Sequence, residues 1–320
     1  MGNAVVLKPD ARTPVSGGFL IARVLEEAGL PEGVLHVLPG VGAEAGAALV
    51  EDPNNQAISF TGSTAVGRKI GEAAGRLLKR VALELGGNNP FVVLEDADVE
   101  LAATAGAFGS FMHQGQICMA TGRHIVHFSL AADYVEALTS KAAALRVGDP
   151  FRDDVDLGPI IDAHQLDHID GLVRETVRGG ARVTTGGEHD RLFYRPTVLA
   201  DVGTDAPAYR QEVFGPVAPV VTFRDDEEAV RLANDSEYGL KAAVHGGSYE
   251  HAMEVGRRLE AGAVHVNDMT VNDEAVAPFP AVKASGNQTA FGGPADVGEF
   301  TRWQWVTARE TPNPVPIGGA

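Results

Sequence analysis

Short runs of apolar and β-branched residues alternate with helix-like segments along the first 85 residues of this 320-residue chain. The strand-like runs lie at residues 4–7, 34–37, 57–60 and 80–85, with helical periodicity at 17–27, 43–50 and 67–78 between them. Strands and helices that alternate at this spacing form βαβ units, in which helices cover the faces of a parallel sheet. Such sheets bind ligands at the carboxyl ends of their strands. We therefore predict buried strands, beginning with residues 4–7, and a ligand site at their ends.

A second α/β unit follows the glycine pair Gly86-Gly87. The pattern predicts strands at residues 91–94, 215–223 and 264–267, and helices at 100–113, 134–145, 165–178 and 226–234. Asp98 stands at the N-cap position of the first of these helices, and acidic residues open the last one, where they suit the helix dipole. The whole pattern predicts an α/β fold with a domain boundary near residue 87.

The charge balance narrows the classes of partner. The 26 Lys and Arg residues are opposed by 43 Asp and Glu residues, for a formal net charge of −17. An acidic surface repels nucleic-acid phosphates and anionic lipid, so we expect neither as a partner. The chain has no apolar run of about 18 residues and no secretion signal, which favours a cytoplasmic protein. One cysteine excludes an internal disulfide, and the histidine spacing predicts no metal site.

The single cysteine, Cys118, follows a predicted helix in the segment FMHQGQICM. A lone cysteine is most often a small buried hydrophobe. A loop after a helix also exposes a thiol to a cleft, and a thiolate attacks carbonyl carbon well. Both interpretations stay open on this segment alone.

Two acidic residues occupy unusual positions. Glu84 lies in the apolar run VALELGGNNP, where burial would raise its pKa and make it a proton acceptor, unless it faces water from an edge strand. Glu212 precedes a Gly-Pro turn in QEVFGPV, where a surface charge is the commoner case.

In SFTGSTAVG, Gly62 and Ser63 lie between a strand and a helix. This position suits either the binding of a pyrophosphate or a plain helix cap.

Taken together and in order, GNAVVLKPD, SFTGSTAVG, LELGGNNP, HQGQIC and EVFGPV resemble the aldehyde dehydrogenase superfamily. The stretches KPDARTPVSGG, FGSFMHQGQICMATGRH, LANDSEYGL and VHVNDMTVNDEA are most similar to its benzaldehyde, vanillin and salicylaldehyde dehydrogenase branch. The match starts about a third of the way along the family's usual chain, so we expect the N-terminal third to be lacking. The resemblance implies an incomplete Rossmann-like NAD(P)-binding domain at residues 1–86 and an α/β catalytic domain at 87–285. Residues 286–320 would return to the cofactor domain and supply an oligomerisation strand and tail.

The resemblance implies that an aldehyde of the aromatic class is oxidised to its carboxylic acid with NAD or NADP. Cys118 would form a thiohemiacetal and then a thioester, and Glu84 would activate the water that hydrolyses it. The implied cofactor-binding residues are Lys8, Gly42, Gly62, Ser63, Leu85, Glu212 and Phe214, and the implied substrate-pocket residues are Met112, Ile117, Met119 and Phe279. A homodimer or homotetramer is implied for the full-length chain. Two alternatives remain, namely a non-catalytic remnant that acts as a binding protein and a thiol esterase that needs no cofactor.

Several residues depart from the family pattern. Arg12 follows Ala11, where many NAD-preferring members have an acid, while Asp10 would oppose a 2′-phosphate, so the choice between NAD and NADP stays open. Pro280-Ala281 replaces the usual Gly-Gly and must alter the turn after Phe279. Trp303 and Trp305 alternate, which predicts one face of a strand, either for oligomer contacts or in the core.

Overall fold

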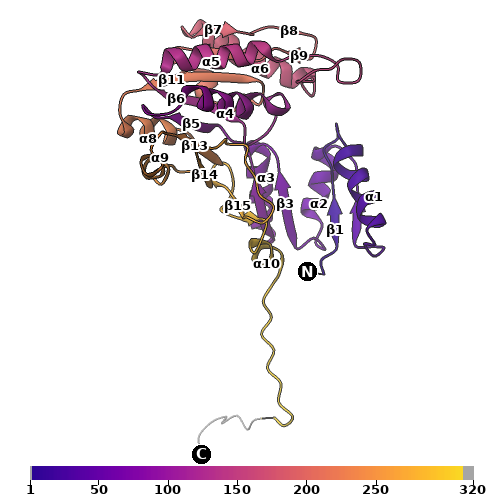
Figure 1. Cartoon of the computed structure of the whole chain (residues 1–320). Helices are drawn as coiled ribbons and strands as arrows, with labels where there is room; N and C mark the ends of the chain where they lie inside the picture. Colours follow the sequence, from indigo (N-terminus) through magenta and orange to yellow (C-terminus); the bar gives the residue numbers. More distant parts are fainter. Residues whose placement is uncertain (1, 313–320) are drawn as a thin grey trace, which may run out of the picture.

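A computed structural model describes residues 2–312 of the chain (Figure 1). Residues 1 and 313–320 lie outside the described part, and with them the end of the tail predicted for residues 286–320. The strands fall into an early group in residues 5–84 and a larger group that begins at Asn89. The pair Gly86-Gly87 lies between the two groups.

A seven-stranded sheet with the order β14-β13-β5-β6-β11-β10-β7 forms the centre of the larger group. Its strands are β5 (Asn89–Val93), β6 (Thr121–His127), β7 (Arg182–Thr185), β10 (Thr197–Ala200), β11 (Val217–Phe223), β13 (Lys241–His245) and β14 (Ala263–Val266). All neighbouring strands are parallel except β7, which runs antiparallel to β10. The carboxyl ends of six strands therefore point the same way.

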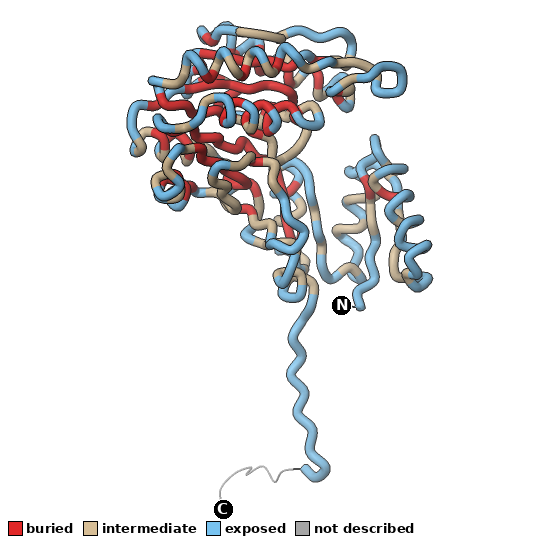
Figure 2. Tube along the Cα trace, in the orientation of Figure 1, coloured by how far each residue is buried: buried red, intermediate tan, exposed pale blue. Residues whose placement is uncertain are grey.

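Helices cover both faces of this sheet. They are α4 (Val99–Phe111), α5 (Ala131–Ala144), α6 (Ala163–Arg178), α7 (Pro207–Arg210), α8 (Asp226–Asn234) and α9 (Tyr249–Gly256). In β5, Phe91 and Val93 pack with α4 and α5, whereas Val92 belongs to the cluster that includes α6, α8 and α9. Strands buried on both faces carry apolar residues at successive positions, and β5 is apolar at every position after Asn89. Figure 2 shows the buried residues concentrated in this part of the molecule.

The early strands form two separate parallel pairs. β1 (Val5–Leu7) pairs with β2 (Leu35–Val37), and β3 (Ala57–Thr61) pairs with β4 (Arg80–Glu84). The helices between them are α1 (Leu20–Glu27), α2 (Ala47–Glu51) and α3 (Thr64–Arg76), with π-helical turns η1 (Val15–Phe19) and η2 (Gly42–Gly46) leading into α1 and α2. The parallel pairing was predicted from the alternation.

The predicted burial of residues 4–7 is wrong. Val5 and Val6 are 48% and 38% exposed. Among the described residues before Ala74, none of the Ala, Val, Ile, Leu, Met, Phe or Tyr side chains is buried. Figure 2 shows this early part almost entirely in the exposed and intermediate colours. The reason is physical, because β1 and β2 form a sheet of only two strands, and the contact of α1 with β2 leaves Val5 and Val6 uncovered.

The segment from Asn287 to Thr301 lies beside β4, where the side chain of Arg80 donates to the carbonyls of Gly298, Glu299 and Thr301. The short elements are β8 (His189–Asp190), β9 (Phe193–Tyr194), β12 (Tyr238–Gly239), β15 (Phe279–Pro280), β16 (Val282–Lys283), β17 (Ala290–Phe291) and α10 (Ala295–Phe300). Beyond α10 the chain is extended but forms no strand, and Trp303 and Trp305 are fully exposed, so a core strand is wrong for the described residues (Figure 1). None of the described helices has the length and apolar character needed to cross a membrane.

Candidate active site

Cys118 lies in a loop between α4 and β6. After α4, a single tight turn, η3 (Met112–Gly115), reverses the chain through three consecutive residues of positive φ, namely His113 at 52°, Gln114 at 57° and Gly115 at 65°. A Cβ atom at Gly115 would lie 2.1 Å from the carbonyl oxygen of Gly215. Cys118 is half-buried after this turn, so its role as a small hydrophobe or as a nucleophile stays a prediction.

Gly115→Ala is expected to destabilise the protein by about 2 kcal/mol or more, because the added methyl group meets backbone and the positive φ strains an L-residue. Gly171→Ala is the matched control, since a Cβ there meets nothing within 4 Å in α6, and alanine favours a helix. The midpoint of urea unfolding, followed by circular dichroism, measures both effects. An unchanged midpoint for Gly115→Ala would contradict the close approach to Gly215.

The glycine pair Gly86-Gly87 brings the end of β4 beside this loop. Glu84 is the last residue of β4 and is 6% exposed. A Cβ at Gly87 would lie 2.5 Å from the Cys118 carbonyl oxygen, so only glycine permits this approach. The Asn89 side-chain amide donates to the Cys118 carbonyl at 2.9 Å and to that of Ala120 at 2.7 Å. The Cys118 loop is therefore held against the segment that follows Glu84.

The Glu84 carboxyl is buried and unpaired. Neither oxygen has a hydrogen-bond partner among the described residues. Burial raises the pKa of Glu84 to about 8, against the opposing effect of the Lys241 charge. A carboxyl group of that pKa takes up a proton near neutral pH, which is what a general base requires. The alternative of an edge carboxylate facing water is wrong.

The surroundings of the thiol favour its protonated form. Burial, together with the negative charges of Glu212 and Glu84, raises the pKa of Cys118 to about 11. The backbone N–H groups of Cys118 and Met119 act in the opposite direction. A thiol in this state needs a neighbouring base to become a nucleophile, and two carboxyl groups lie nearby.

Glu212 is the second of these carboxyl groups. Its Oε1 accepts the Gly87 N–H at 2.8 Å, and a Cβ at Gly86 would lie 2.5 Å from Oε2. Burial raises its pKa to about 7, with the Gly87 hydrogen bond lowering it. The surface-charge alternative for Glu212 is therefore wrong. Phe214, two residues on, adopts a positive φ of 50°, and its carbonyl accepts a hydrogen bond from the Gln165 side chain at 3.0 Å.

The other residues implied to bind a cofactor form two groups. Gly62 and Ser63 link β3 to α3, and Ser63 Oγ caps that helix by accepting the Val66 N–H at 3.4 Å. Leu85 packs against this helix, because a Cβ at Gly67 would lie 2.3 Å from its Cδ2. Lys8 and Gly42 form the second group. Lys8 Nζ donates to the carbonyls of Pro9 at 2.5 Å and Gly40 at 3.2 Å, and Gly42 is the first residue of η2.

Three of the four residues implied to line a substrate pocket lie within six positions of Cys118 in the sequence. Met112 is exposed at the start of η3, while Ile117 and Met119 flank the thiol and are half-buried. Phe279 is half-buried in β15, and its ring centroid lies 4.2 Å from Lys241 Nζ. Sequence reasoning missed Lys241, although a cation at the head of the apolar run KAAVH was a visible signal. Among the described residues, no group of three or more His, Cys, Asp or Glu side chains is arranged to hold a metal ion.

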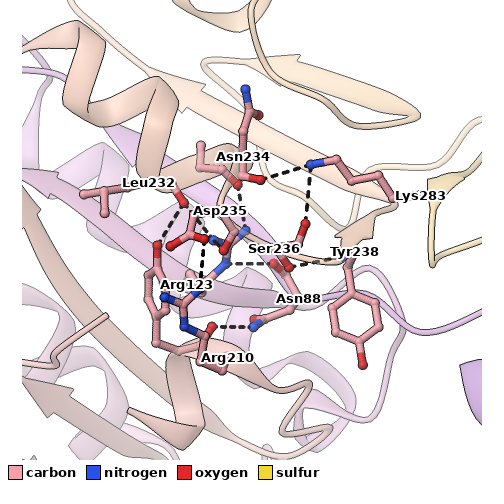
Figure 3. Close-up of polar contacts among 11 residues, drawn as sticks. Asn88, Arg123, Arg210, Leu232, Asn234, Asp235, Ser236, Tyr238 and Lys283 are labelled. Carbon is pink, nitrogen blue, oxygen red and sulfur yellow. Dashed lines mark hydrogen bonds and ion pairs between the residues drawn. The ribbon is translucent and has the colours of Figure 1, made fainter. Parts of the chain in front are cut away.

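A buried arginine, also missed, anchors the loop that follows Glu84 (Figure 3). Arg123 is 1% exposed, and its guanidinium donates to the Asn88 carbonyl at 3.0 Å. It also donates to the carbonyls of Leu232 and Ala233, each at 2.9 Å, at the end of α8. A cation suits the negative end of a helix dipole. Arg123 thus ties the Gly86-Gly87 loop to the C-terminus of α8.

Arg123→Met is expected to lower the free energy of unfolding by about 3 kcal/mol, because the carbonyls of Asn88, Leu232 and Ala233 each lose a buried hydrogen bond from a charged donor. The matched control is Arg210→Met. Both guanidinium groups lie over the Tyr209 ring, at 5.3 and 5.2 Å, but Arg210 is 44% exposed and its partner is Asp235. A surface ion pair contributes about 1 kcal/mol or less. Equal losses in the two variants, measured by urea unfolding, would contradict the role of Arg123.

The fold and the site together define a family. Parallel α/β architecture, a cysteine loop and a buried glutamate beside a glycine pair agree with the sequence match to the aldehyde dehydrogenase family, which covers residues 1–306. The chain belongs to the aldehyde dehydrogenase family.

Similar proteins are named for aromatic aldehydes. The chain is 58% identical over 310 residues to a vanillin dehydrogenase of an Amycolatopsis species, covering 97% of this chain and 64% of that protein. It is 49% identical over 317 residues to the NAD(+) benzaldehyde dehydrogenase of Pseudomonas putida, covering 99% of this chain and 65% of that protein. The chain therefore spans slightly less than two thirds of the length of these relatives.

Solved structures of the family share the fold. The crystal structure of Mycobacterium tuberculosis aldehyde dehydrogenase complexed with NAD+ matches with a TM-score of 0.89 and 35% identity, covering 93% of this chain and 62% of that one. The crystal structure of NAD-dependent aldehyde dehydrogenase from Sinorhizobium meliloti matches with a TM-score of 0.91 and 35% identity. The match covers 97% of this chain and 62% of that one. The predicted aldehyde dehydrogenase fold is confirmed.

Proposed function

We propose that this chain carries the catalytic site of an NAD(P)-dependent dehydrogenase that oxidises aromatic aldehydes to carboxylic acids. The observation that supports it most is the meeting of the Cys118 loop, Glu84 and Glu212 at Gly86-Gly87. Titratable groups with raised pKa values that gather around one nucleophile are typical of catalytic sites. The names of the relatives favour the aromatic class of substrate.

The residues present fit a nicotinamide dinucleotide. Glu212 uses one carboxylate oxygen for the Gly87 N–H, which leaves Oε2 for a ribose hydroxyl within the described structure. The first N–H groups of α3, a helix of 13 residues, begin at the carboxyl end of β3, where a pyrophosphate would be held. Lys8, Gly42, Leu85 and Phe214 are proposed to complete this site. NAD or NADP, when bound, would accept the hydride that leaves the substrate carbon.

The chain's own residues would perform the remaining steps. A carboxylate takes the thiol proton, and the Cys118 sulfur forms a bond to the aldehyde carbon, giving a thiohemiacetal. After oxidation the same carbon is held as a thioester. Glu84 then takes a proton from water, the hydroxide adds to the thioester carbon, and the C–S bond breaks as the sulfur regains a proton. Met112, Ile117, Met119 and Phe279 would surround the aldehyde.

The choice between the two cofactors remains part of the proposal. Arg12 forms ion pairs with Asp10 at 2.9 Å and with Asp162 at 2.8 Å, so its charge is already neutralised by carboxylates. This pairing favours NAD over NADP, because a 2′-phosphate would have to compete with both acids.

We also propose a division of the chain into three parts. Residues 1–86 would form the cofactor-binding domain, residues 87–285 the catalytic domain, and residues 286–320 the segment that returns to the cofactor-binding domain.

The test is the formation of reduced nicotinamide from benzaldehyde by the purified chain, followed by absorbance. Growth of the reduced-nicotinamide band with either cofactor is the expected result. Ester hydrolysis without a cofactor and without this band would favour the thiol esterase instead. Neither activity, in a chain with an intact circular dichroism spectrum, would overturn the proposal in favour of a binding protein.

A further inference from the structure

The side chain of Asn89 joins three segments around the candidate site. Asn89 is the first residue of β5 and is 1% exposed. Its amide nitrogen donates to the carbonyls of Cys118 at 2.9 Å and Ala120 at 2.7 Å, and its Oδ1 accepts the Lys241 N–H at 2.9 Å. Both hydrogens of the amide and its oxygen are therefore used. A buried amide that is paired in this way holds its partners in one arrangement.

The two carbonyls belong to a tight turn that has the thiol at its centre. The Ala120 N–H donates to the Ile117 carbonyl at 2.9 Å, which makes Cys118 and Met119 the central residues of a β-turn. The amide of Asn89 thus grips the second and the fourth residue of the turn. Because it spans the turn, it fixes the backbone from which the thiol projects.

The β-sheet does not hold this turn by itself. β6 begins at Thr121, and its register with β5 shifts at once, with Asn89 opposite Thr121 and Pro90 opposite Arg123. Within the part of the chain that the structure describes, Asn89 is the only side chain that forms a hydrogen bond with residues 117–120. Without its amide, the two carbonyls would lose their donors in the closed turn, which favours opening of the turn towards water.

Packing places the gripped carbonyl beside the carboxyl groups of the site. A Cβ at Gly87 would lie 2.5 Å from the Cys118 carbonyl oxygen and 3.0 Å from Asn89 Oδ1. The Gly87 N–H in turn donates to Glu212 at 2.8 Å. The Cys118 carbonyl is therefore confined between the Asn89 amide and the backbone that binds Glu212. Groups that react with one another lose much of their rate when such a placement shifts by about 1 Å.

We propose that Asn89 is a positioning residue of this site, whose side-chain amide keeps the turn at Cys118 closed and so fixes the thiol relative to Glu84 and Glu212. Its meaning for catalysis rests on the proposed function, but its effect on the accessibility of the thiol does not. Asn89 acts through two backbone carbonyls and exchanges no proton with the substrate. Without it, the thiol is easier to reach and less well placed.

Alkylation of Cys118 by iodoacetamide, at neutral pH and without denaturant, tests the hold on the turn. Cys118 is the only cysteine of the chain, so the mass added to the protein counts this one thiol. Asn89→Ala removes both donors and adds no charge near the sulfur. The rate of alkylation is expected to rise by about tenfold or more, because the closed turn loses two buried hydrogen bonds that the open turn does not need.

Asn88→Ala is the matched control. Asn88 adjoins Asn89 and is 2% exposed, so the substitution removes the same atoms from an equally buried position. Its amide donates to the Tyr209 carbonyl at 2.8 Å instead of to the turn. The alkylation rate of this variant is expected to match that of the unaltered chain. Asn89→Leu, which has a similar volume and no donors, decides the question if Asn89→Ala does not fold by circular dichroism.

Turnover gives a second readout. In a chain that oxidises benzaldehyde, Asn89→Ala is expected to lower kcat by about 10–100-fold while KM for the cofactor stays unchanged, because only the placement of the thiol is altered. The midpoint of urea unfolding measures the stability lost by the Asn88 and Asn89 variants. Faster alkylation together with slower turnover separates a positioning role from a general loss of stability.

The outcomes separate this inference from the proposed function. Alkylation needs neither aldehyde nor nicotinamide, so faster alkylation in a chain that never reduces nicotinamide supports the hold on the turn and overturns the proposed function alone. Equal alkylation rates for the folded Asn89 variants and the unaltered chain overturn the role of Asn89, and so does an equal rise in Asn88→Ala. An unchanged kcat in an active chain overturns it as well. Loss of the fold in both Asn89 variants does the same, because the residue then supports the whole domain instead of the turn.

Discussion

Replacing Cys118 by alanine is expected to reduce aldehyde-dependent formation of reduced nicotinamide by about 10⁴-fold or more, which is to the background rate. The substitution removes the atom that would bond to the substrate carbon, and the chain contains no second thiol to replace it. Initial rates with benzaldehyde, at saturating cofactor, provide the measurement.

The fold should survive this substitution. Cys118 is partly exposed. Its loop is held through its backbone carbonyl, which accepts a hydrogen bond from the Asn89 side-chain amide. Cofactor binding, followed by calorimetry, is expected to persist. A variant that keeps more than a tenth of the activity would show that the oxidation does not pass through this thiol.

Glu84→Gln is expected to separate the two halves of the reaction. Oxidation should still release up to one equivalent of reduced nicotinamide per chain as an initial burst, while steady turnover falls by about 10²–10⁴-fold, because glutamine cannot take a proton from water. Rapid-mixing absorbance measurements resolve the burst from the steady rate. Glu95→Gln, which alters an exposed carboxylate, is the control and should leave both phases intact.

The pH dependence of the unaltered chain follows from the same group. The pKa of Glu84 is raised to about 8, so the base form accumulates as the pH rises through 8, and steady turnover should rise with it. Glu84→Gln should abolish this rise. If the burst and the steady rate disappear together, Glu84 does not act specifically in the hydrolysis of the thioester.

Local sequence signals predicted the elements that carry their own caps and periodicity. The helix at residues 226–234 coincides with α8, where Asp225 accepts the Glu228 N–H and acidic residues fill the first turn. Asp98 caps α4 as expected, by accepting the Leu101 N–H. Strand β13 was missed because its sequence, KAAVH, has a single β-branched residue and no alternation.

The environment of the site was harder to predict than its members. The burial of Glu84 follows from its apolar neighbours, but the proximity of Lys241 and the anchoring by Arg123 depend on contacts between residues more than 100 positions apart. The predicted burial of residues 4–7 failed for the opposite reason. Apolar composition indicates a tendency to be covered, and it does not supply the covering element. The assigned roles of the site residues stay predictions until the variants are measured.

The hydroxyl of Ser285 has a consequence for how this protein acquires its native state. It donates to the carbonyl of Gly86, which lies 199 positions earlier in the chain. The neighbouring antiparallel β-bridge between Glu84 and Gly286 spans a similar separation. Contacts of such long range form late, because the entropy of closing so large a loop must be overcome first. During synthesis on the ribosome, Glu84 would therefore stay hydrated, with the ordinary pKa of a carboxyl group, until more than nine tenths of the described polypeptide had emerged.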